Sequence, residues 1–417
     1  MDATKNKDIM STKPLIVSPA GNLEKLKFAV KYGADNVYFG GEGFNLRVQA
    51  DNFTFPEIEE GVKFCRERGV KTTFLMNSFL HENQISEAEK YASRVKELGC
   101  DSVMVSDPGM LMILKDAGIE ADFHLSTQMS TLNHRSIKFW LDAGFKRIVL
   151  GREVTLDEIK EIKRNTDAKI EIFVHGALCI AYSGRCLLSR YLSGRDANAG
   201  DCSQPCRWKY FLMEEKRPGL YLKVMENQKS TEILSSKDLC LIEKIEEYVD
   251  AGVDAFKIEG RIKSLYHAAN TTRVYKHAVQ LAGTEGFGEN LPFWLSELDL
   301  ISHRPYTSNL FDEFGLMGYD GVPYINKALF VAYRTDEGES DEIMIKTFNP
   351  VYKGETLDCI YPIGERILDR KYRVKKIYME DKEFEMARPN SFYRIKLDSP
   401  VFDDAIFRRP LVPKEKS

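Results

Sequence analysis

Five of the eight cysteines of this 417-residue chain fall between residues 179 and 240. Four of them share one passage rich in glycine and arginine, and the fifth follows it. The steps between them are long and unequal, and the paired short knuckles that hold structural zinc are absent. Thiolate ligands that come from separate loops are typical of an iron–sulfur cluster. The sequence therefore predicts such a cluster on Cys179, Cys186, one of Cys202 and Cys206, and Cys240.

Two other uses of these thiols stay open. Buried cysteines can pack as small hydrophobic side chains, an interpretation that fits Cys65, Cys100 and Cys359 better than the group of five. A nucleophilic thiol is the second use, since His175 stands four residues before Cys179 and could activate it. One catalytic thiol does not explain the other four, and the protease motifs HExxH and GxSxG are absent.

Short apolar strands alternate with amphipathic helices around this passage, and many of the helices end in glycine. Eight strands are predicted, at residues 15–20, 36–41, 71–77, 102–107, 121–127, 147–153, 169–177 and 254–261. Eight such units indicate an α/β fold with a TIM-type (β/α) barrel rather than a doubly wound open sheet. The cysteines then lie in an insertion, residues 178–250, between the seventh and eighth strands.

The remainder of the chain has a different pattern. We expect the barrel to occupy residues 1–285 and a linker to occupy residues 286–330. Residues 331–417 alternate apolar and polar side chains between turn residues, which predicts a small antiparallel, barrel-like β domain. The whole chain has a net charge of −4, but residues 351–417 carry 15 Lys and Arg against 12 Asp and Glu, a balance of +3. This end is therefore the part best suited to nucleic acid.

In a TIM barrel, the side chains that do chemistry lie at the C-terminal ends of the strands. Four residues near those ends could act as general acid or base, and the sequence gives no choice among Glu42, Glu153, His175 and Glu259. Cations near the same ends or in the insertion could bind carboxylate or phosphate groups. They are Arg47, Arg152, Arg185, Arg195, Arg207, Lys257 and Arg261.

Several stretches resemble the collagenase-like peptidase family U32. They are EIFVHGALCIAYSGRCLLS, GRDANAGDCSQPCRWKY, SSKDLC and KIEGRIKS, and NPVYKGETLDCIYPIGE resembles the C-terminal domain of the tRNA-modifying branch of that family. The resemblance implies oxygen-independent hydroxylation of the tRNA wobble uridine to 5-hydroxyuridine, with prephenate as the oxygen source. It also implies a [4Fe–4S] cluster on Cys179, Cys186, Cys202 and Cys240, which leaves Cys206 spare. A U32-type peptidase is the alternative function.

The same resemblance names the expected partners. They are the tRNA anticodon loop, whose bases are exposed for recognition, and a second, related U32 subunit. The sequence has neither an N-terminal signal-like segment nor an apolar run of membrane-spanning length. We therefore expect a cytoplasmic protein without a membrane partner.

Overall fold

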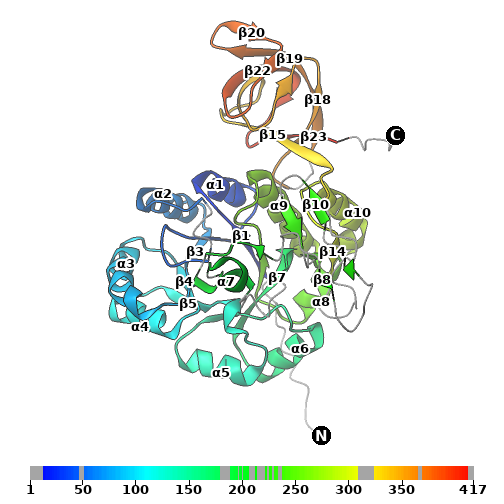
Figure 1. Cartoon of the computed structure of the whole chain (residues 1–417). Helices are drawn as coiled ribbons and strands as arrows, with labels where there is room; N and C mark the ends of the chain where they lie inside the picture. The colour runs from blue at the N-terminus through cyan, green and yellow to red at the C-terminus, as the bar shows by residue number, and fades with distance from the viewer. Residues whose placement is uncertain are drawn as a thin grey trace.

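Eight parallel strands form a closed barrel in the computed structural model (Figure 1). The structure describes residues 13–46, 51–178, 188–195, 197–199, 201–205, 212–213, 221–222, 225–227, 230–232, 237–308, 324–364 and 369–411. The barrel strands are β1 (Leu15–Pro19), β2 (Asn36–Phe39), β3 (Lys71–Met76), β4 (Ser102–Val105), β5 (Asp122–Leu125), β6 (Arg147–Val149), β7 (Lys169–Ala177) and β13 (Ala255–Ile258). They pair in this order, and β13 closes the barrel by pairing with both β7 and β1. The predicted TIM-type α/β fold is confirmed.

Helices surround the barrel. They are α1 (Leu23–Lys31), α2 (Phe55–Arg66), α3 (Ile85–Glu97), α4 (Pro108–Asp116), α5 (His134–Asp142), α6 (Leu156–Asn165), α8 (Ile245–Asp250) and α9 (Leu265–Leu281). Short polar side chains cap several N-termini: Asn22 accepts from the backbone of Lys25, and Thr155 forms a capping box with Glu158. Gly118 follows α4 in the left-handed region, with φ +70°, as the sequence pattern predicts.

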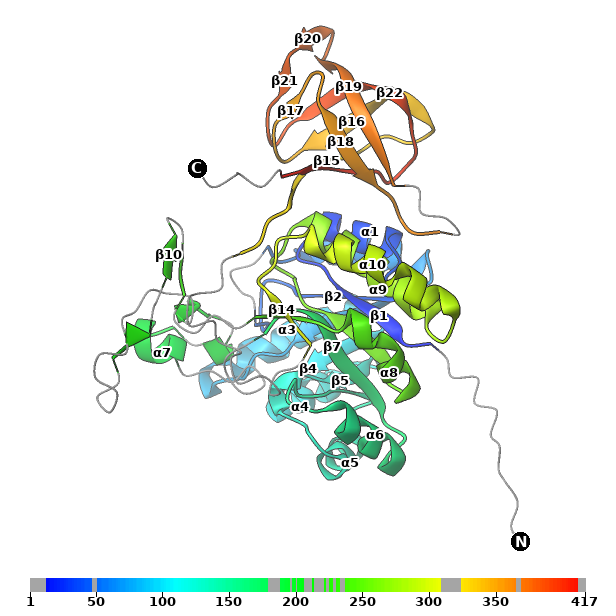
Figure 2. The same cartoon turned by 90° about the vertical axis from the view of Figure 1, so that its right-hand side faces the viewer.

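The insertion begins after β7 and runs to α8. Its described elements are α7 (Leu188–Ser193), β8 (Leu212–Met213), β9 (Tyr221–Leu222), β10 (Met225–Asn227), β11 (Ser230–Glu232) and β12 (Asp238–Cys240), with 3₁₀ turns at Ala197–Ala199 and Ile242–Lys244. In the described part of the barrel, 3₁₀ turns also occur at Glu82–Gln84 and Thr127–Met129. In Figure 1, α7 lies in front of the centre of the barrel, and Figure 2 shows it to one side of the strands. The insertion therefore stands over one end of the barrel.

The range 286–330, expected as a linker, begins with a helix. The helix α10 (Glu285–Asp299) packs on α9, and β14 (Tyr306–Thr307) pairs with β12. Phe287, Trp294 and Leu298 are buried at helical spacing. The helix was not predicted because two glycines and Pro292, all within it, interrupt the helical spacing of apolar residues in the sequence.

The C-terminal domain is a separate antiparallel sheet with its own core. Its strands are β15 (Ala328–Arg334), β16 (Ser340–Thr347), β17 (Val351–Tyr352), β18 (Thr356–Ile360), β19 (Arg370–Met379), β20 (Lys382–Phe384), β21 (Met386–Ala387), β22 (Phe392–Val401) and β23 (Ile406–Pro410). The order β18-β23-β15-β16-β22-β19 closes because β18 also pairs with β19. The predicted antiparallel β domain is confirmed.

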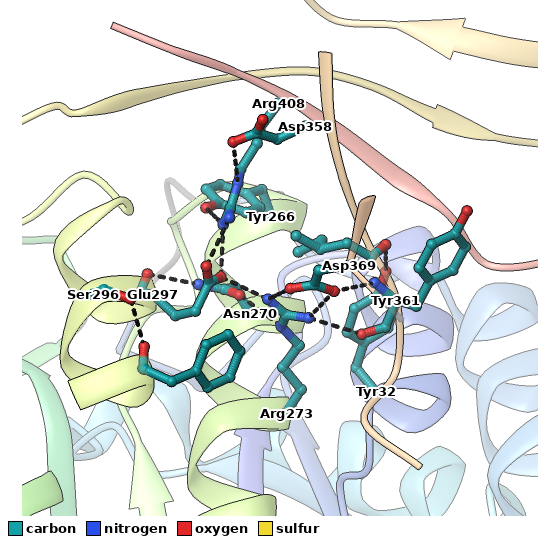
Figure 3. Close-up of polar contacts among 12 residues, drawn as sticks. Tyr32, Tyr266, Asn270, Arg273, Ser296, Glu297, Asp358, Tyr361, Asp369 and Arg408 are labelled. Carbon is teal, nitrogen blue, oxygen red and sulfur yellow. Dashed lines mark hydrogen bonds and ion pairs between the residues drawn. The ribbon is translucent and has the colours of Figure 1, made fainter. Parts of the chain in front are cut away.

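A buried network of charges joins the two domains (Figure 3). Glu297 of α10 receives Arg273 Nη2 at 2.6 Å and Arg408 Nη1 and Nη2 at 2.6 and 2.7 Å. Arg273 also binds both carboxylate oxygens of Asp369, at 2.8 and 2.9 Å. Burial raises the pKa of the Glu297 carboxyl, but the two guanidinium groups outweigh it and hold this pKa below its usual range. Apolar residues of both domains, including Phe28 and Ile360, surround the network.

Candidate active site

The C-terminal end of the barrel is covered by the cysteine-bearing insertion. The backbone N–H of Phe79, just after β3, lies 3.5 Å from the carbonyl oxygen of Asn198 in the insertion. Together with the position of α7 in Figures 1 and 2, this contact places the insertion across the barrel mouth. A TIM barrel holds its active site at this end.

Strand β12 carries Cys240 to the edge of the mouth. It pairs antiparallel with the end of β7, so that Cys240 lies opposite His175, four residues before Cys179. Asp238, in the same strand, accepts hydrogen bonds from Arg304 Nε at 2.9 Å and Nη2 at 2.7 Å, and both side chains are buried. The strand is thus fixed on one side by β7 and on the other by the segment that includes β14.

Both described cysteines of the predicted cluster are free thiols in similar backbone settings. Cys202 is half-buried, and its Sγ accepts a hydrogen bond from the backbone N–H of Gln204 at 3.4 Å. Cys240 is buried and accepts one from the backbone N–H of Ile242, and its Sγ lies 3.6 Å from the Tyr275 hydroxyl. Burial raises the pKa of the Cys240 thiol to about 11, against the lowering effect of these two donors.

These surroundings fit an iron–sulfur cluster. Cluster sulfurs are stabilised by hydrogen bonds from the backbone, and iron binding deprotonates a thiol whose pKa is otherwise high. Cys179, Cys186 and Cys206 lie outside the described residues, so the complete ligand set stays a prediction. Within the described residues, no three His, Cys, Asp or Glu side chains converge on one point, at this place or elsewhere.

A group of ionisable side chains fills the barrel interior beneath the mouth. Glu171 of β7 accepts Lys257 Nζ at 2.9 Å and Arg147 Nη1 at 3.3 Å, and both Glu171 and Lys257 are buried. Burial raises the pKa of Glu171, but the charges of Lys257 and Arg147 bring it below the usual value. Burial, followed by the charge of Arg147, lowers the pKa of His124 to about 3, so this imidazole is neutral.

Tyr38 connects this interior group to the mouth. Lys257 Nζ lies 4.3 Å from the centre of the Tyr38 ring. The Tyr38 hydroxyl is 2.9 Å from the carbonyl oxygen of Ile258 and 3.3 Å from Glu259 Oε2. Glu259 is half-buried, which leaves part of its carboxylate open to the mouth. It is therefore the predicted acid or base that is best placed for chemistry.

His175 lies on the same side of the barrel wall as Cys240, and the side chains of both contact the Tyr275 hydroxyl. Its ring contacts His267 and Tyr275 of α9 and Tyr306 of β14, and Nδ1 is 3.4 Å from the Tyr275 hydroxyl. A bulge places one extra residue of β7 beside the Lys257–Ile258 step, which changes the face toward which His175 points. Burial and neighbouring His267 lower its pKa well below the usual value. This imidazole is thus a neutral packing group behind the strand.

Two predicted cations lie at the mouth. Arg261 is buried, and its Nη2 donates to Asn45 Oδ1 at 2.7 Å and to Asn52 Oδ1 at 2.8 Å. A Cβ at Gly40 would lie 2.8 Å from Arg261 Nη1, so this glycine leaves space for the guanidinium group. Arg152 stacks on the Phe173 ring, 4.1 Å from its centre.

A cavity of about 510 Å³ lies beside Arg152 within the described part of the chain. Apolar side chains, including Phe173 and Leu239, form part of its wall, and Arg152, Lys160 and Lys244 supply positive charge. Asp157 and Glu247 also line the cavity, so three cations face two carboxylates, and the small positive excess together with the apolar walls is compatible with a small organic anion.

The other predicted residues are dispersed. Arg195 Nε donates to Asp201 at 2.8 Å within the insertion, Glu42 is exposed and Glu153 is half-buried. Lys257 points into the barrel toward Glu171. Arg47, Arg185 and Arg207 lie outside the described residues.

The interior group of His124, Arg147 and Glu171 was not predicted from the sequence, and neither was Tyr38. One signal was available, because a charged or imidazole side chain inside a short strand with apolar neighbours requires a buried partner. The strands ADFHLST and KIEIFVHGA both show this feature.

A sequence profile of peptidase family U32 matches residues 21–315. The chain belongs to this family. This U32 protein is 35% identical over 414 residues to tRNA hydroxylation protein P1 of Bacillus subtilis, a match that covers 97% of this chain and 96% of the relative. It is 34% identical over 397 residues to tRNA hydroxylation protein P of Escherichia coli, covering 84% and 87% of the two chains.

A relative with a different name is also similar to this U32 protein. A collagenase of Porphyromonas gingivalis is 35% identical over 304 residues, which cover 70% of this chain and 72% of the relative. The match to the Bacillus protein therefore includes both domains, whereas the collagenase match is restricted to a shorter part of the chain. None of the described helices is both long enough and apolar enough to cross a membrane.

Proposed function

We propose that this U32 protein hydroxylates the wobble uridine of tRNA to 5-hydroxyuridine, with prephenate as the oxygen source and a [4Fe–4S] cluster as cofactor. The observation that carries the proposal is the similarity to tRNA hydroxylation protein P1 along 97% of the chain, both domains included. The cysteine-bearing insertion across the barrel mouth supports the cofactor. Unstacked bases of an anticodon loop can enter such a mouth.

Each part of the site has a role in this proposal. Cys179, Cys186, Cys202 and Cys240 would hold the cluster, which supplies electron transfer or a Lewis-acidic iron when bound. Hydroxylation at C5 of uracil is a two-electron oxidation, in which prephenate as the proposed oxygen donor would lose a C–O bond and take up the electron pair and a proton. The C5 hydrogen would leave as a proton, so a base must accept it. Glu259 fills this role, because its carboxylate lies partly open at the mouth and is oriented by Tyr38.

Prephenate carries two carboxylates and a small apolar ring. The cavity beside Arg152 offers cations for the carboxylates and apolar walls for the ring. Arg261, held by Asn45 and Asn52, contributes positive charge on the opposite part of the mouth. The chain's own residues thus bind and orient the small co-substrate next to the place where the base enters.

Anaerobic purification tests the cofactor. The wild-type protein should be brown and should contain iron and sulfide, and Cys240→Ala should lose both. Cys100→Ala is the matched control, because Cys100 is also buried but lies outside the insertion. Iron-free wild-type protein after anaerobic reconstitution would contradict the cluster assignment.

Nucleoside analysis tests the reaction. Deletion of the gene should remove 5-hydroxyuridine and its derivatives from bulk tRNA, and the intact gene should restore them. A variant with Glu259→Gln should not restore them. Unchanged nucleosides in the deletion strain would disprove the proposed function.

Peptidase activity is the second candidate, supported by the collagenase relative. It needs a base for the Cys179 thiol, and His175 is buried behind β7 among residues of α9. Gelatin cleavage by cluster-free protein, abolished by Cys179→Ser, would favour this function. A second, related U32 subunit also stays a prediction, which co-purification from cells tests.

A further inference from the structure

Strand β19 of the C-terminal domain carries an exposed row of cations. Five of its first seven residues are positively charged and exposed, whereas Tyr372 and Val374 between them are buried in the domain core. We call this row the β19 strip, and it consists of Arg370, Lys371, Arg373, Lys375 and Lys376. Alternate residues of a strand lie about 7 Å apart, which is similar to the separation of successive phosphates along an RNA strand.

The β19 strip has little compensating negative charge among the described residues. Lys371 and Lys376 each reach a carboxylate oxygen only at 4.0 Å, and Lys375 has no ion pair there. Other cations of the same domain are paired closely: Arg409 lies 2.7 Å from Glu355, and Lys353 lies 2.8 Å from Glu383. The strip is therefore a local positive surface within a domain that otherwise neutralises its cations.

The neighbouring strand extends this surface. Lys376 lies directly opposite Lys396 of β22, and Tyr378 lies opposite Arg394. Lys396 lies 3.8 Å from Asp341 and Arg394 lies 3.3 Å from Glu342, so the cations of β22 are partly neutralised, whereas among the described residues those of the β19 strip are less so. The Tyr378 ring has Arg394 at 5.3 Å and Lys376 at 6.0 Å from its centre, an arrangement that also suits contact with a base or sugar.

The strip has a fixed position relative to the barrel. Asp369 directly precedes Arg370, and both of its carboxylate oxygens bind Arg273 of α9 (Figure 3). Strand β19 therefore begins at the domain interface and leads away from the barrel, as Figure 2 shows.

We infer that the β19 strip binds the phosphate backbone of the tRNA outside the anticodon loop. This inference rests on the proposed function and adds to it a second contact surface on the substrate. The exposed cations bind phosphates through charge, so their contribution must decrease as salt increases. They add affinity for long RNA without selecting a base.

Binding of two RNAs tests the inference. The triple variant Arg373→Gln, Lys375→Gln, Lys376→Gln removes three charges from exposed positions, and Lys63→Gln, Lys90→Gln, Lys96→Gln removes three from exposed positions on α2 and α3. The probes are an unmodified full-length tRNA transcript and its isolated anticodon stem-loop. Affinity is measured by fluorescence anisotropy between about 50 and 200 mM KCl, the range in which phosphate contacts are most evident.

The β19 triple variant should bind full-length tRNA at least about tenfold more weakly at 100 mM KCl, with a slope of log Kd against log salt smaller by about 2. Its affinity for the anticodon stem-loop should match that of the wild type, and the control variant should match the wild type on both RNAs. Equal tRNA affinity and slope for the triple variant and the wild type would overturn the inference, and so would an equal loss on the stem-loop.

Hydroxylation assays separate this inference from the proposed function. If the wild-type holoenzyme hydroxylates tRNA and the triple variant does so equally at low tRNA concentration, only the β19 inference fails. If the wild-type holoenzyme neither binds nor hydroxylates tRNA, the proposed function fails. Reduced hydroxylation of full-length tRNA at low concentration, recovered at saturating tRNA, supports both.

Discussion

The molecule contains two buried networks of charge that differ in their balance. At the domain interface, Arg273 and Arg408 meet Glu297 and Asp369, so two positive charges face two negative ones. Inside the barrel, Lys257 and Arg147 share the single carboxylate of Glu171. The first network is complete without any ligand, whereas the second leaves an excess of positive charge beneath the mouth. The balanced network joins the two domains, whereas the interior group lies beneath the candidate active site, where perturbed ionisable groups often occur.

Removal of Glu297 tests the structural side of this comparison. Glu297→Ala leaves two buried guanidinium groups without their shared carboxylate, which should lower the free energy of unfolding by about 3–5 kcal/mol. Urea denaturation measures the change. Glu161→Ala, which removes the exposed partner of Arg164, is the control and should leave stability nearly unchanged. Similar losses in both variants would contradict a special role for the interface.

Removal of the Glu259 charge tests the chemical side. Glu259→Gln keeps the shape of the side chain but cannot accept a proton, so turnover of tRNA should fall about 100-fold or more while the unfolding midpoint stays the same. Glu42→Gln is the matched control, since Glu42 is an exposed carboxylate that follows β2 at the same end of the barrel. Equal losses in the two variants would exclude Glu259 as the base.

The neutral imidazole in the barrel network predicts a pH dependence of stability. His124 has its pKa lowered to about 3 in the folded protein, against about 6.5 in the unfolded chain. Between these values the unfolded state binds more protons, so stability should fall as pH decreases from 6.5. His124→Asn should reduce this slope by up to about 1.4 kcal/mol per pH unit between pH 4 and 6.

Urea denaturation at several pH values provides the measurement, and data above pH 7 provide the internal control. His124 is neutral in both states there, so the slopes of the wild type and the variant should coincide. A variant with the wild-type slope at pH 4 to 6 would show that His124 is protonated in the folded barrel.

The smallest expected effect concerns the connection between the barrel network and the mouth. Tyr38→Phe removes the hydroxyl that lies near Ile258 O and Glu259 Oε2, and it keeps the ring that faces Lys257. The loss should raise the barrier to turnover by about 0.5–1.5 kcal/mol, since one hydrogen bond is removed. Steady-state kinetics measure it, and an effect on kcat that vanishes in the Glu259→Gln background would establish that Tyr38 acts through Glu259.

The sequence predicted all eight barrel strands because each is a short apolar run between turn residues. It did not predict α10, because Gly286, Gly288 and Pro292 interrupt the helical pattern. The β domain was predicted from the alternation of apolar and polar side chains, because each of its strands has one face in the core and the other in water.

The strand ends at which the candidate residues lie were predicted from the sequence, but the orientation of their side chains was not. Residues that follow a strand reach the mouth, as Arg261 and Glu259 do. The face toward which a side chain points depends on register, and the bulge in β7 that reorients His175 leaves no mark in the sequence. Lys257 was predicted to meet substrate, yet its partner Glu171 lies 86 residues earlier in the chain. An ion pair between residues so far apart in the chain forms only because the barrel closes and brings β7 next to β13.

The position of β12 has a consequence for how the protein matures. This strand brings Cys240 to the mouth only when it is held between β7 and β14, and Asp238 is bound by Arg304. During synthesis, the eight barrel strands emerge from the ribosome before residues 304–307 do. A nascent chain can therefore close its barrel before the fourth thiol is fixed in place. For the proposed cluster, this order predicts that iron and sulfide are inserted late, after synthesis of the segment beyond the barrel.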